Sequence, residues 1–474
     1  MNKQQKSLCI AVLMGICIYF FMPEANGLTH AGVSLLSVFI PTIYLWLICG
    51  TGWTSLLSIT MVVLLQVYDG TSAYMTLWGN ICAAAVIPFL MISTVLEESG
   101  AFEWIVKWII SRKCIHGRPI LFLIMMIFSM VIISVFTAPQ VVAVLFFNLL
   151  SEVTAAIGYK KEDSFYTSYG LVIGWISQIC DGVLIWGRPY LLTMIAVVSG
   201  LGFTKFTVMT YFQFALFYLL LAVVVILCIV KFWIRPDLSK FVNYDDAKIR
   251  RELKENPISK RGKIALAGMV LILSCYVLAS FQTYFSKITI AGSVTLICAL
   301  LCVITVDGKP VMDLNKAASK VPWSMIFFLG AIMFYAGTVG SDVYGISTCL
   351  QNILSPMIGN MPVFVAIFMG LTFASIATNF CSNSVSGVVV CSSFIPALMS
   401  ISGMETGQIL AFACGVIAIC GTAICTVSAC PTMSIVYSDI GIQYNGTAKY
   451  SACLCASMVL ITTCILIPIF THIF

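Results

Sequence analysis

The sequence predicts an all-α polytopic membrane protein built from two halves of inverted topology. Three observations predict it. Of the 474 residues, 60% are hydrophobic and 9% are charged, whereas a soluble domain carries roughly a quarter charged residues. Apolar runs long enough to cross a bilayer recur along the chain, and four landmarks repeat at a nearly constant spacing. This composition excludes a water-soluble domain of comparable size.

Nine apolar segments have the length of a single transmembrane helix, which needs about 20 residues. The first follows Lys3 and Lys6, and residues 23–27 do not form a small-x-small cleavage site, so we expect an uncleaved span rather than a signal peptide. The nine segments are 7–22, 31–49, 52–68, 79–96, 208–233, 262–281, 286–306, 322–339 and 448–470.

Four longer tracts carry a polar or Gly/Pro interruption near their middle. Two of these tracts, 119–150 and 362–399, predict re-entrant hairpins. The other two, 164–200 and 407–438, predict helices broken at mid-membrane. Irregular backbone at that depth needs protein or water to satisfy its hydrogen bonds, so a buried cavity is expected. The hairpin tracts are 119–150, interrupted at 137–140, and 362–399, interrupted at 379–384; the broken helices are 164–200, interrupted at 186–189, and 407–438, interrupted at 428–431.

The charges predict the orientation of the chain. We place the N-terminus in the cytoplasm and let each hairpin return to its own side. Of the 25 Lys and Arg residues, all but three then lie in the cytoplasm, as the positive-inside rule requires. The exceptions are Lys205 and Lys287 outside and Arg188 in the membrane. The predicted topology is eleven spans plus one hairpin from each face of the plasma (inner) membrane, with the C-terminus outside. The amphipathic segment 101–113 is expected at the interface.

An internal repeat supports this layout. Trp78 and Trp323 begin predicted spans, and Gly100 and Gly345 follow them, both at an offset of 245. Chance alignment of apolar segments is the alternative, but four landmarks within three residues of one offset favour an inverted repeat. The other two landmarks are 134–140 with 378–384, at 244, and 187–189 with 429–431, at 242. The predicted domains are 1–77 (scaffold and dimerisation helices), 78–233 (first repeat), 234–321 (cytoplasmic linker and connecting helices) and 322–474 (second repeat).

Composition also excludes several classes of function. The chain has three histidines, no pair of CxxC motifs, and 20 cysteines that mostly stand alone in apolar runs, where Cys behaves as a small hydrophobe. We therefore expect no metal centre and no His-dependent hydrolase. The net charge of +6 reflects topology rather than nucleic-acid binding. A membrane-embedded enzyme would need a cluster of His, Ser or carboxylate residues at membrane depth, and none is visible. Without a nucleotide-binding loop, the driving force must be a gradient.

The interruptions indicate where a solute would bind. Helix N-termini that meet at mid-membrane favour an anion, and carbonyls at helix C-termini coordinate small cations. Ser382-Asn383-Ser384 adds two hydroxyls and a carboxamide, all neutral, which suit an anion that must bind and then leave. The same residues are good turn and cap residues, and the two roles are compatible. The expected function is secondary transport of small organic anions.

With Val321-Pro322-Trp323, Thr378, Ser382-Asn383-Ser384 and Ala429-Cys430-Pro431, the sequence resembles the divalent anion/sodium symporter family (DASS) of the ion transporter superfamily. That family carries Ser-Asn-Thr at each hairpin tip and Gly/Ala-Thr-Pro in each broken helix. The resemblance implies elevator-type homodimers that move dicarboxylates, citrate or sulfate, usually with sodium.

The resemblance also implies site residues, by position. We expect no cofactor, Na⁺ as the candidate coupling ion, and as partners a small anion, membrane lipid and a second copy of the chain. The implied sodium ligands are Thr378, Cys381, Asn383 and Ala429 in the second half, with Ser134 and Gly187 as their first-half equivalents. The implied substrate contacts are Thr137, Gln140, Arg188, Pro189, Ser382, Asn383, Ser384, Pro431 and Thr432.

The first half departs from the family pattern. Residues 138–140 read Ala-Pro-Gln instead of Ser-Asn-Thr, and Arg188 stands where Thr is usual. An arginine at the bilayer centre costs about 2.5–3.5 kcal/mol, so it is expected to be paired or functional. It could pair with Asp181, about two helical turns earlier. We favour the other role, in which Arg188 replaces the first sodium or binds a substrate carboxylate bidentately.

A related function remains open. An ion antiporter, or an inorganic oxyanion transporter of the sulfate or arsenite type, would belong to the same superfamily. Such proteins usually place ionised carboxylates at the centre, and here Asp181 is the one candidate.

Overall fold

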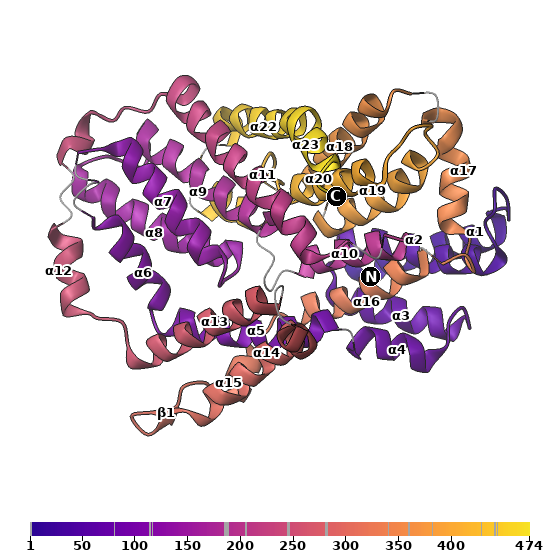
Figure 1. The fold of residues 1–474 in the computed structure, drawn as a ribbon, viewed down its shortest axis with the longest axis horizontal. Helices are drawn as coiled ribbons and strands as arrows, with labels where there is room; N and C mark the ends of the chain where they lie inside the picture. Colours follow the sequence, from indigo (N-terminus) through magenta and orange to yellow (C-terminus); the bar gives the residue numbers. More distant parts are fainter. Residues whose placement is uncertain are drawn as a thin grey trace.

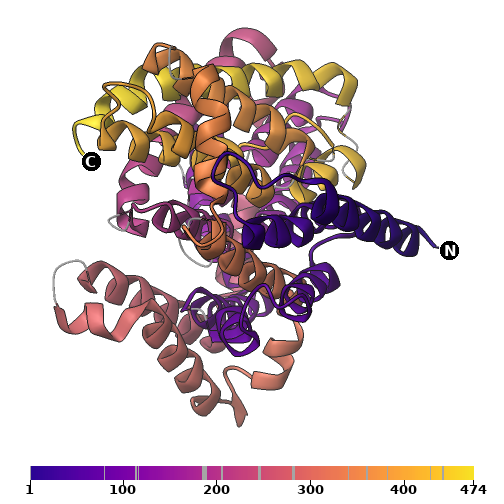
Figure 2. The ribbon, with the colours of Figure 1, turned by 90° about the vertical axis from the view of Figure 1, so that its right-hand side faces the viewer.

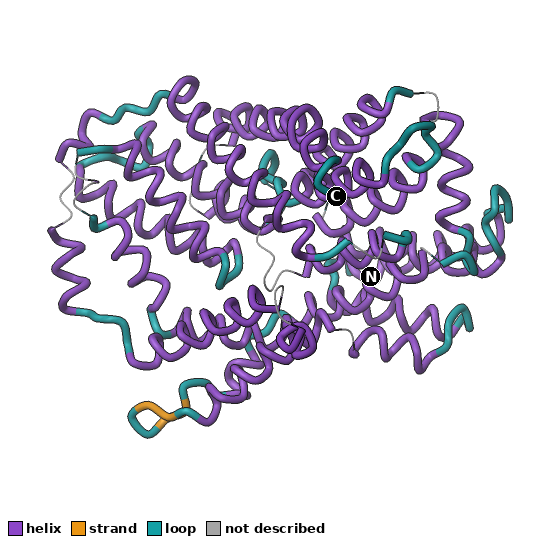
Figure 3. The backbone as a smooth tube through the Cα atoms, viewed as in Figure 1, coloured by secondary structure: helices purple, strands orange, loops and turns teal. Residues whose placement is uncertain are grey.

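The fold is almost entirely helical, with one short pair of antiparallel strands, β1 (Thr305–Val306) and β2 (Lys309–Pro310), among the residues described (Figure 3). The computed structural model describes residues 2–79, 81–112, 115, 117–183, 189–203, 206–243, 247–279, 283–339, 341–358, 361–381, 383–427, 429–439, 442 and 444–474.

One group of helices occupies the lower part of Figure 1, where α16 packs on α3, α4 and α5, and α14 packs on α5 and α13. These helices are α3 (Gly52–Leu64), α4 (Gly70–Gly79), α5 (Ile81–Glu98), α13 (Lys260–Ala279), α14 (Thr283–Val303), α15 (Leu314–Ser319) and α16 (Trp323–Val339). At the edge of the molecule, α1 (Lys3–Phe21) packs on α2 (His30–Cys49), and Figure 2 shows it projecting there. Its outer face exposes Leu13, Phe20 and Phe21, as a lipid-facing helix does.

The remaining helices form the upper part of the same view. From the earlier part of the chain they are α6 (Ala101–Ile110), α7 (Pro119–Ser134), α8 (Pro139–Ile157), α9 (Ser164–Val183), α10 (Pro189–Gly200), α11 (Val208–Cys228), which continues as a π-helical turn, and α12 (Ala247–Glu255). From the later part they are α17 (Ile346–Ile358), α18 (Val363–Phe380), α19 (Asn383–Leu398), α20 (Thr406–Cys420), α21 (Pro431–Ser434), α22 (Tyr444–Ile461) and α23 (Ile467–Thr471).

Six helices of the described chain are long and apolar enough to cross a membrane, and seven shorter apolar helices accompany them. The six are Lys3–Phe21, Gly70–Glu98, Pro139–Ile157, Val208–Ile234, Val363–Phe380 and Gly446–Thr471. Several predicted spans therefore coincide with helices shorter than a full crossing, among them 52–68 and 322–339.

Three of the four predicted interruptions coincide with described ends of helices; of the interruption at 186–189 the structure describes only Pro189, where α10 begins. Helix α7 ends at Ser134 and α8 begins with Pro139; α20 ends at Cys420 and the chain next turns helical at Pro431. Proline lacks an N–H and has a fixed φ, so it suits the first helical position. Local sequence chemistry thus sets where α8 and α21 begin.

Ion pairs attach the predicted linker to the helices around it. Lys107 of α6 lies 2.8 Å from Glu103 and 3.3 Å from Glu252 of α12. At the end of α5, Glu98 accepts from three cations of α13 and α15: Arg261 at 3.2 Å, Lys316 at 2.9 Å and Lys320 at 2.5 Å. The segment after α11 is therefore bound to α5 and α6.

Candidate functional site

The turn between α18 and α19 brings three oxygen atoms together. Thr378 is fully buried, and its Oγ1 lies 3.0 Å from Asn383 Oδ1 and 2.7 Å from the carbonyl oxygen of Cys420. A hydroxyl has one proton and can donate it to only one of the two acceptors. The cluster consists of hard, neutral oxygen donors, the type that coordinates Na⁺ where helices unwind. Thr378, Asn383 and the Cys420 carbonyl are therefore the described groups that could hold a sodium ion at this turn.

Asn379, next to this cluster, holds segment 421–430 against α18; the described residues of this segment, 421–427 and 429–430, are non-helical. Its Oδ1 accepts from the Cys425 N–H at 2.7 Å, and its Nδ2 donates to the Ser375 carbonyl at 2.7 Å. Its own carbonyl accepts from the Thr426 hydroxyl. A buried carboxamide can satisfy several backbone groups at once, so Asn379 stabilises irregular backbone that has no helical partners. Asn379 lies in the predicted interruption 379–384, but no role was predicted for it.

Segment 421–430 ends at α21, where three of the predicted site residues lie. The thiol of Cys430 accepts from the Met433 N–H at 3.4 Å and so caps α21. Ala429 is 5% exposed, Pro431 is exposed, and Thr432 is fully buried. The Thr432 side chain interacts with the Cys430 thiol, so these two residues are paired at the start of α21.

Helix α11 contacts the end of α9 and the residue after Gly421 through two tyrosines. The Tyr211 hydroxyl donates to the carbonyl of Gly182, in the last turn of α9. The Tyr218 hydroxyl lies 2.7 Å from Thr422 Oγ1, just after α20. Both tyrosines are fully buried, and seven residues are about two helical turns, so they share one face of α11. Neither tyrosine was expected at the site.

Helices α9 and α20 meet backbone to backbone. A Cβ on Gly182 would lie 2.7 Å from the Cα of Gly421, and a Cβ on Gly421 would lie 2.5 Å from the Cα of Gly182. No side chain larger than hydrogen fits between them. This crossing fixes the relative position of the last turns of α9 and α20.

The first-half turn lies against the end of α5. The Thr137 hydroxyl donates to the Glu97 carboxylate, and the Ser93 hydroxyl donates to the Phe136 carbonyl at 2.6 Å. Thr137, predicted as a substrate contact, thus has a carboxylate partner. Gln140 is half-buried in the first turn of α8, and Ser134, predicted as a sodium ligand, is buried at the end of α7. Glu97 was missed, because it follows the apolar span 79–96.

The remaining predicted residues are placed as follows. Ser384 is 8% exposed in the first turn of α19, and half-buried Cys381 ends α18 with its N–H donating to the Ala377 carbonyl at 2.8 Å. Pro189 begins α10. Gly187, Arg188 and Ser382 lie outside the described residues. Asp181 lies in the last turn of α9. No group of three or more His, Cys, Asp and Glu side chains forms a metal site within the described ranges.

Comparison with known proteins gives the family. The model of the CitMHS citrate transporter family matches residues 42–386. An uncharacterized transporter of Methanocaldococcus jannaschii is 25% identical over 202 residues, which is 42% of this chain and 43% of that protein. The arsenical pump membrane proteins of Escherichia coli K12 and Shigella flexneri are each 23% identical over 351 residues, 72% of this chain and 73% of theirs.

These matches refine the prediction from the motifs. The resemblance to the divalent anion/sodium symporter family stays a prediction, whereas the match to the citrate transporter model covers well over half of the chain. The family consists of transporters and not of enzymes, in agreement with the expectation from composition. The chain therefore belongs to the citrate transporter family, as a multi-pass membrane protein that carries out secondary transport.

Proposed function

We propose that this protein transports citrate or a similar di- or tricarboxylate by an elevator-type alternating-access mechanism. The anion binds between the turn that separates α18 from α19 and segment 421–430. The observation that carries the proposal is the double connection between these breaks: Thr378 bonds to the Cys420 carbonyl, and Asn379 bonds to the Cys425 N–H. The family match supports the substrate class.

The charges at this site explain how an ion and an anion are bound together. The first N–H groups of α19, at Asn383 and Ser384, have no helical acceptor and carry the positive end of the helix dipole. They favour a substrate carboxylate. The oxygens of Thr378, Asn383 and Cys420 favour a cation a few ångströms away. Each ion lowers the electrostatic cost of binding the other, because opposite charges attract strongly where water is excluded. Sodium is the proposed coupling ion.

The alternating-access part of the proposal rests on an inverted repeat, with 78–233 and 322–474 as the two halves. Gly100 precedes α6 with φ of 69°, and Gly345 precedes α17 with φ of 62°, so the two landmark glycines share a left-handed conformation. Contacts between the halves are also reciprocal, since α10 packs on α19 and α21 packs on α8. In this proposal the segments 1–77 and 234–321 are the scaffold and the dimer contact.

The test is uptake of labelled citrate, succinate and sulfate into proteoliposomes with and without a sodium gradient. We expect sodium-stimulated uptake of a carboxylate by the wild type. Asn383→Ala should abolish this uptake while the purified protein stays monodisperse, because it removes a carboxamide from the proposed site. The matched control is Asn148→Ala, which removes an exposed carboxamide on α8. Unchanged uptake kinetics in Asn383→Ala would sink the assignment.

A second function is favoured by a specific contact. Glu97 accepts from Thr137 at the first-half turn, which gives this turn the carboxylate that an ion antiporter or oxyanion transporter needs. The similarity to arsenical pump membrane proteins points the same way. Transport of arsenite or sulfate driven by a proton gradient, without any carboxylate uptake in the same vesicles, would replace the first proposal.

A further inference from the structure

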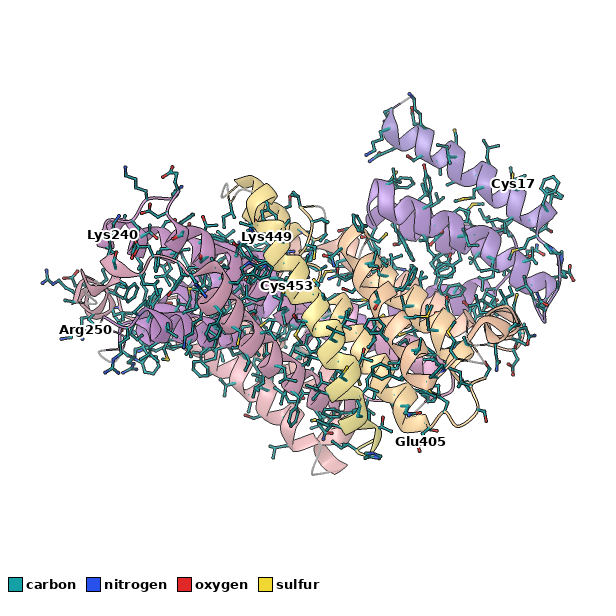
Figure 4. All side chains as sticks on the ribbon, turned by 90° about the horizontal axis from the view of Figure 1, so that it is seen from above. Cys17, Lys240, Arg250, Glu405, Lys449 and Cys453 are labelled. Atoms are coloured by element: carbon teal, nitrogen blue, oxygen red, sulfur yellow. The ribbon has the colours of Figure 1, made fainter. Side chains whose placement is uncertain are left out.

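Two thiols from distant parts of the chain touch beside segment 421–430. The Sγ of Cys425, within this segment, lies 3.3 Å from the Sγ of Cys455 on α22. Both are free cysteines. The Cys455 thiol also lies 3.4 Å from the Thr422 carbonyl and 4.0 Å from Asn379 Nδ2. Cys453, two residues earlier on the same helix (Figure 4), instead contacts Ser457 at 3.9 Å.

The separation of the two sulfur atoms selects the ligand. It is too long for a disulfide, whose S–S bond is about 2.05 Å. A single atom that binds both sulfurs at about 2.3 Å, the length of a zinc–thiolate bond, would subtend an angle of about 90°. A linear two-coordinate metal would need the sulfurs about 4.6 Å apart at that bond length. Zinc needs four ligands in a structural site, and the described side chains near this pair do not supply a third His, Cys, Asp or Glu.

Trivalent arsenic and antimony are pyramidal and bind thiolates with angles close to a right angle. We propose that Cys425 and Cys455 form a dithiol site that captures a trivalent arsenical. Each S–H proton passes to an arsenic-bound hydroxyl, which leaves as water. Two arsenic–oxygen bonds break and two arsenic–sulfur bonds form, and no atom changes oxidation state.

Capture at this site links segment 421–430 covalently to α22. The segment otherwise meets α18 through the hydrogen bonds of Asn379, which can break and re-form. A covalent bridge between Cys425 and Cys455 cannot break and re-form in this way. Any transport step that displaces segment 421–430 from α22 is therefore blocked. This consequence rests on the proposed transport site, whereas the capture itself rests on the thiols alone.

The capture is tested with phenylarsine oxide, which presents two exchangeable arsenic–oxygen bonds when hydrated. The measurement is the intact mass of the purified full chain. The background carries Cys298→Ser and Cys302→Ser, because these two thiols lie one helical turn apart on α14 and could form a second pair. We expect one phenylarsenic unit fewer in Cys425→Ser and in Cys455→Ser than in the background. Cys453→Ser is the matched control and should keep the full number.

The consequence for transport is tested in proteoliposomes made from the same proteins. Uptake after treatment is divided by the untreated rate of each variant, so that a change of basal rate does not matter. We expect severalfold inhibition in the background, reversed by 2,3-dimercaptopropanol and not by a monothiol, and little inhibition in either variant. Equal adduct numbers in background and variants would overturn the site. An adduct that does not inhibit uptake would overturn the covalent block of transport. If the untreated protein takes up no carboxylate at all, the proposed substrate is wrong, but the mass result stays valid.

Discussion

Replacing Gly182 by alanine tests the crossing of α9 and α20. The new Cβ would lie 2.7 Å from the Cα of Gly421, 3.4 Å from its nitrogen and 3.5 Å from its carbonyl carbon. Carbon atoms in contact prefer about 3.5–4.0 Å, so the two helices must part by about 1 Å. All three neighbouring atoms are backbone atoms, so no side chain can rotate away.

The size of the effect follows from two opposing contributions. Overpacking a dense core costs about 1–3 kcal/mol, and the upper end applies here because the obstacle is a helix backbone. Alanine returns up to about 1 kcal/mol, since it is a better helix former than glycine. We therefore expect a net destabilisation of about 2 kcal/mol for Gly182→Ala. Uptake should fall as well, because Gly421 directly precedes the segment that follows α20.

The assay is the unfolding free energy in denaturant, measured in detergent, together with the uptake rate. The control is Gly337→Ala, a glycine of α16 with open space where a Cβ would stand. We expect this control to be neutral or slightly stabilising, for the same propensity reason. A Gly182→Ala protein as stable and as active as the wild type would show that the close crossing does not exist.

Three further substitutions follow from the contacts described above, and a fourth, at Arg188, follows from the sequence. Asn379→Ala removes the acceptor of the Cys425 N–H; we expect a loss of about 1–3 kcal/mol of unfolding free energy and faster hydrogen exchange of the Cys425 amide. Tyr218→Phe removes the hydrogen bond to Thr422, and should lower the unfolding free energy by about 1 kcal/mol. The uptake rate at saturating substrate then reports whether segment 421–430 has moved. Glu98→Gln weakens three partly exposed ion pairs, so its loss of about 1 kcal/mol should shrink when unfolding is repeated in about 1 M salt. Arg188→Gln should reduce substrate affinity severely if Arg188 replaces a sodium ion, and normal transport, or a wild-type requirement for two or more sodium ions per substrate, would contradict that role.

Much of the fold was predictable because its signals are local. Proline favours the first helical position, where it stands in α8 and α21, and the polar residues around both prolines are visible in the sequence. Helix α19 begins at Asn383, within the predicted interruption 379–384. Hydropathy located the helices but not their lengths, because a 13-residue helix such as α3 is as apolar as a full span.

The contacts that build the site were not predictable, because they join distant residues. Nothing in the neighbourhood of Tyr211 indicates that its hydroxyl meets Gly182, and the partner of Asn379 is a backbone N–H 46 residues later. The cysteines show the same limit. The interpretation of Cys as a small hydrophobe fits Cys391 and Cys414, which are fully buried. It fails to anticipate Cys425 and Cys455, since only folding brings the two thiols together.

Helix α11 has a consequence for how this chain can evolve. It belongs to the part before residue 234, yet Tyr218 bonds to Thr422, in the part after it. A gene fusion that joined one part of this protein to the other part of a relative would inherit the hydroxyl of Thr422 without the tyrosine that fits it. Substitutions at Tyr218 and at Thr422 are therefore expected to occur together, because each side chain fits the other.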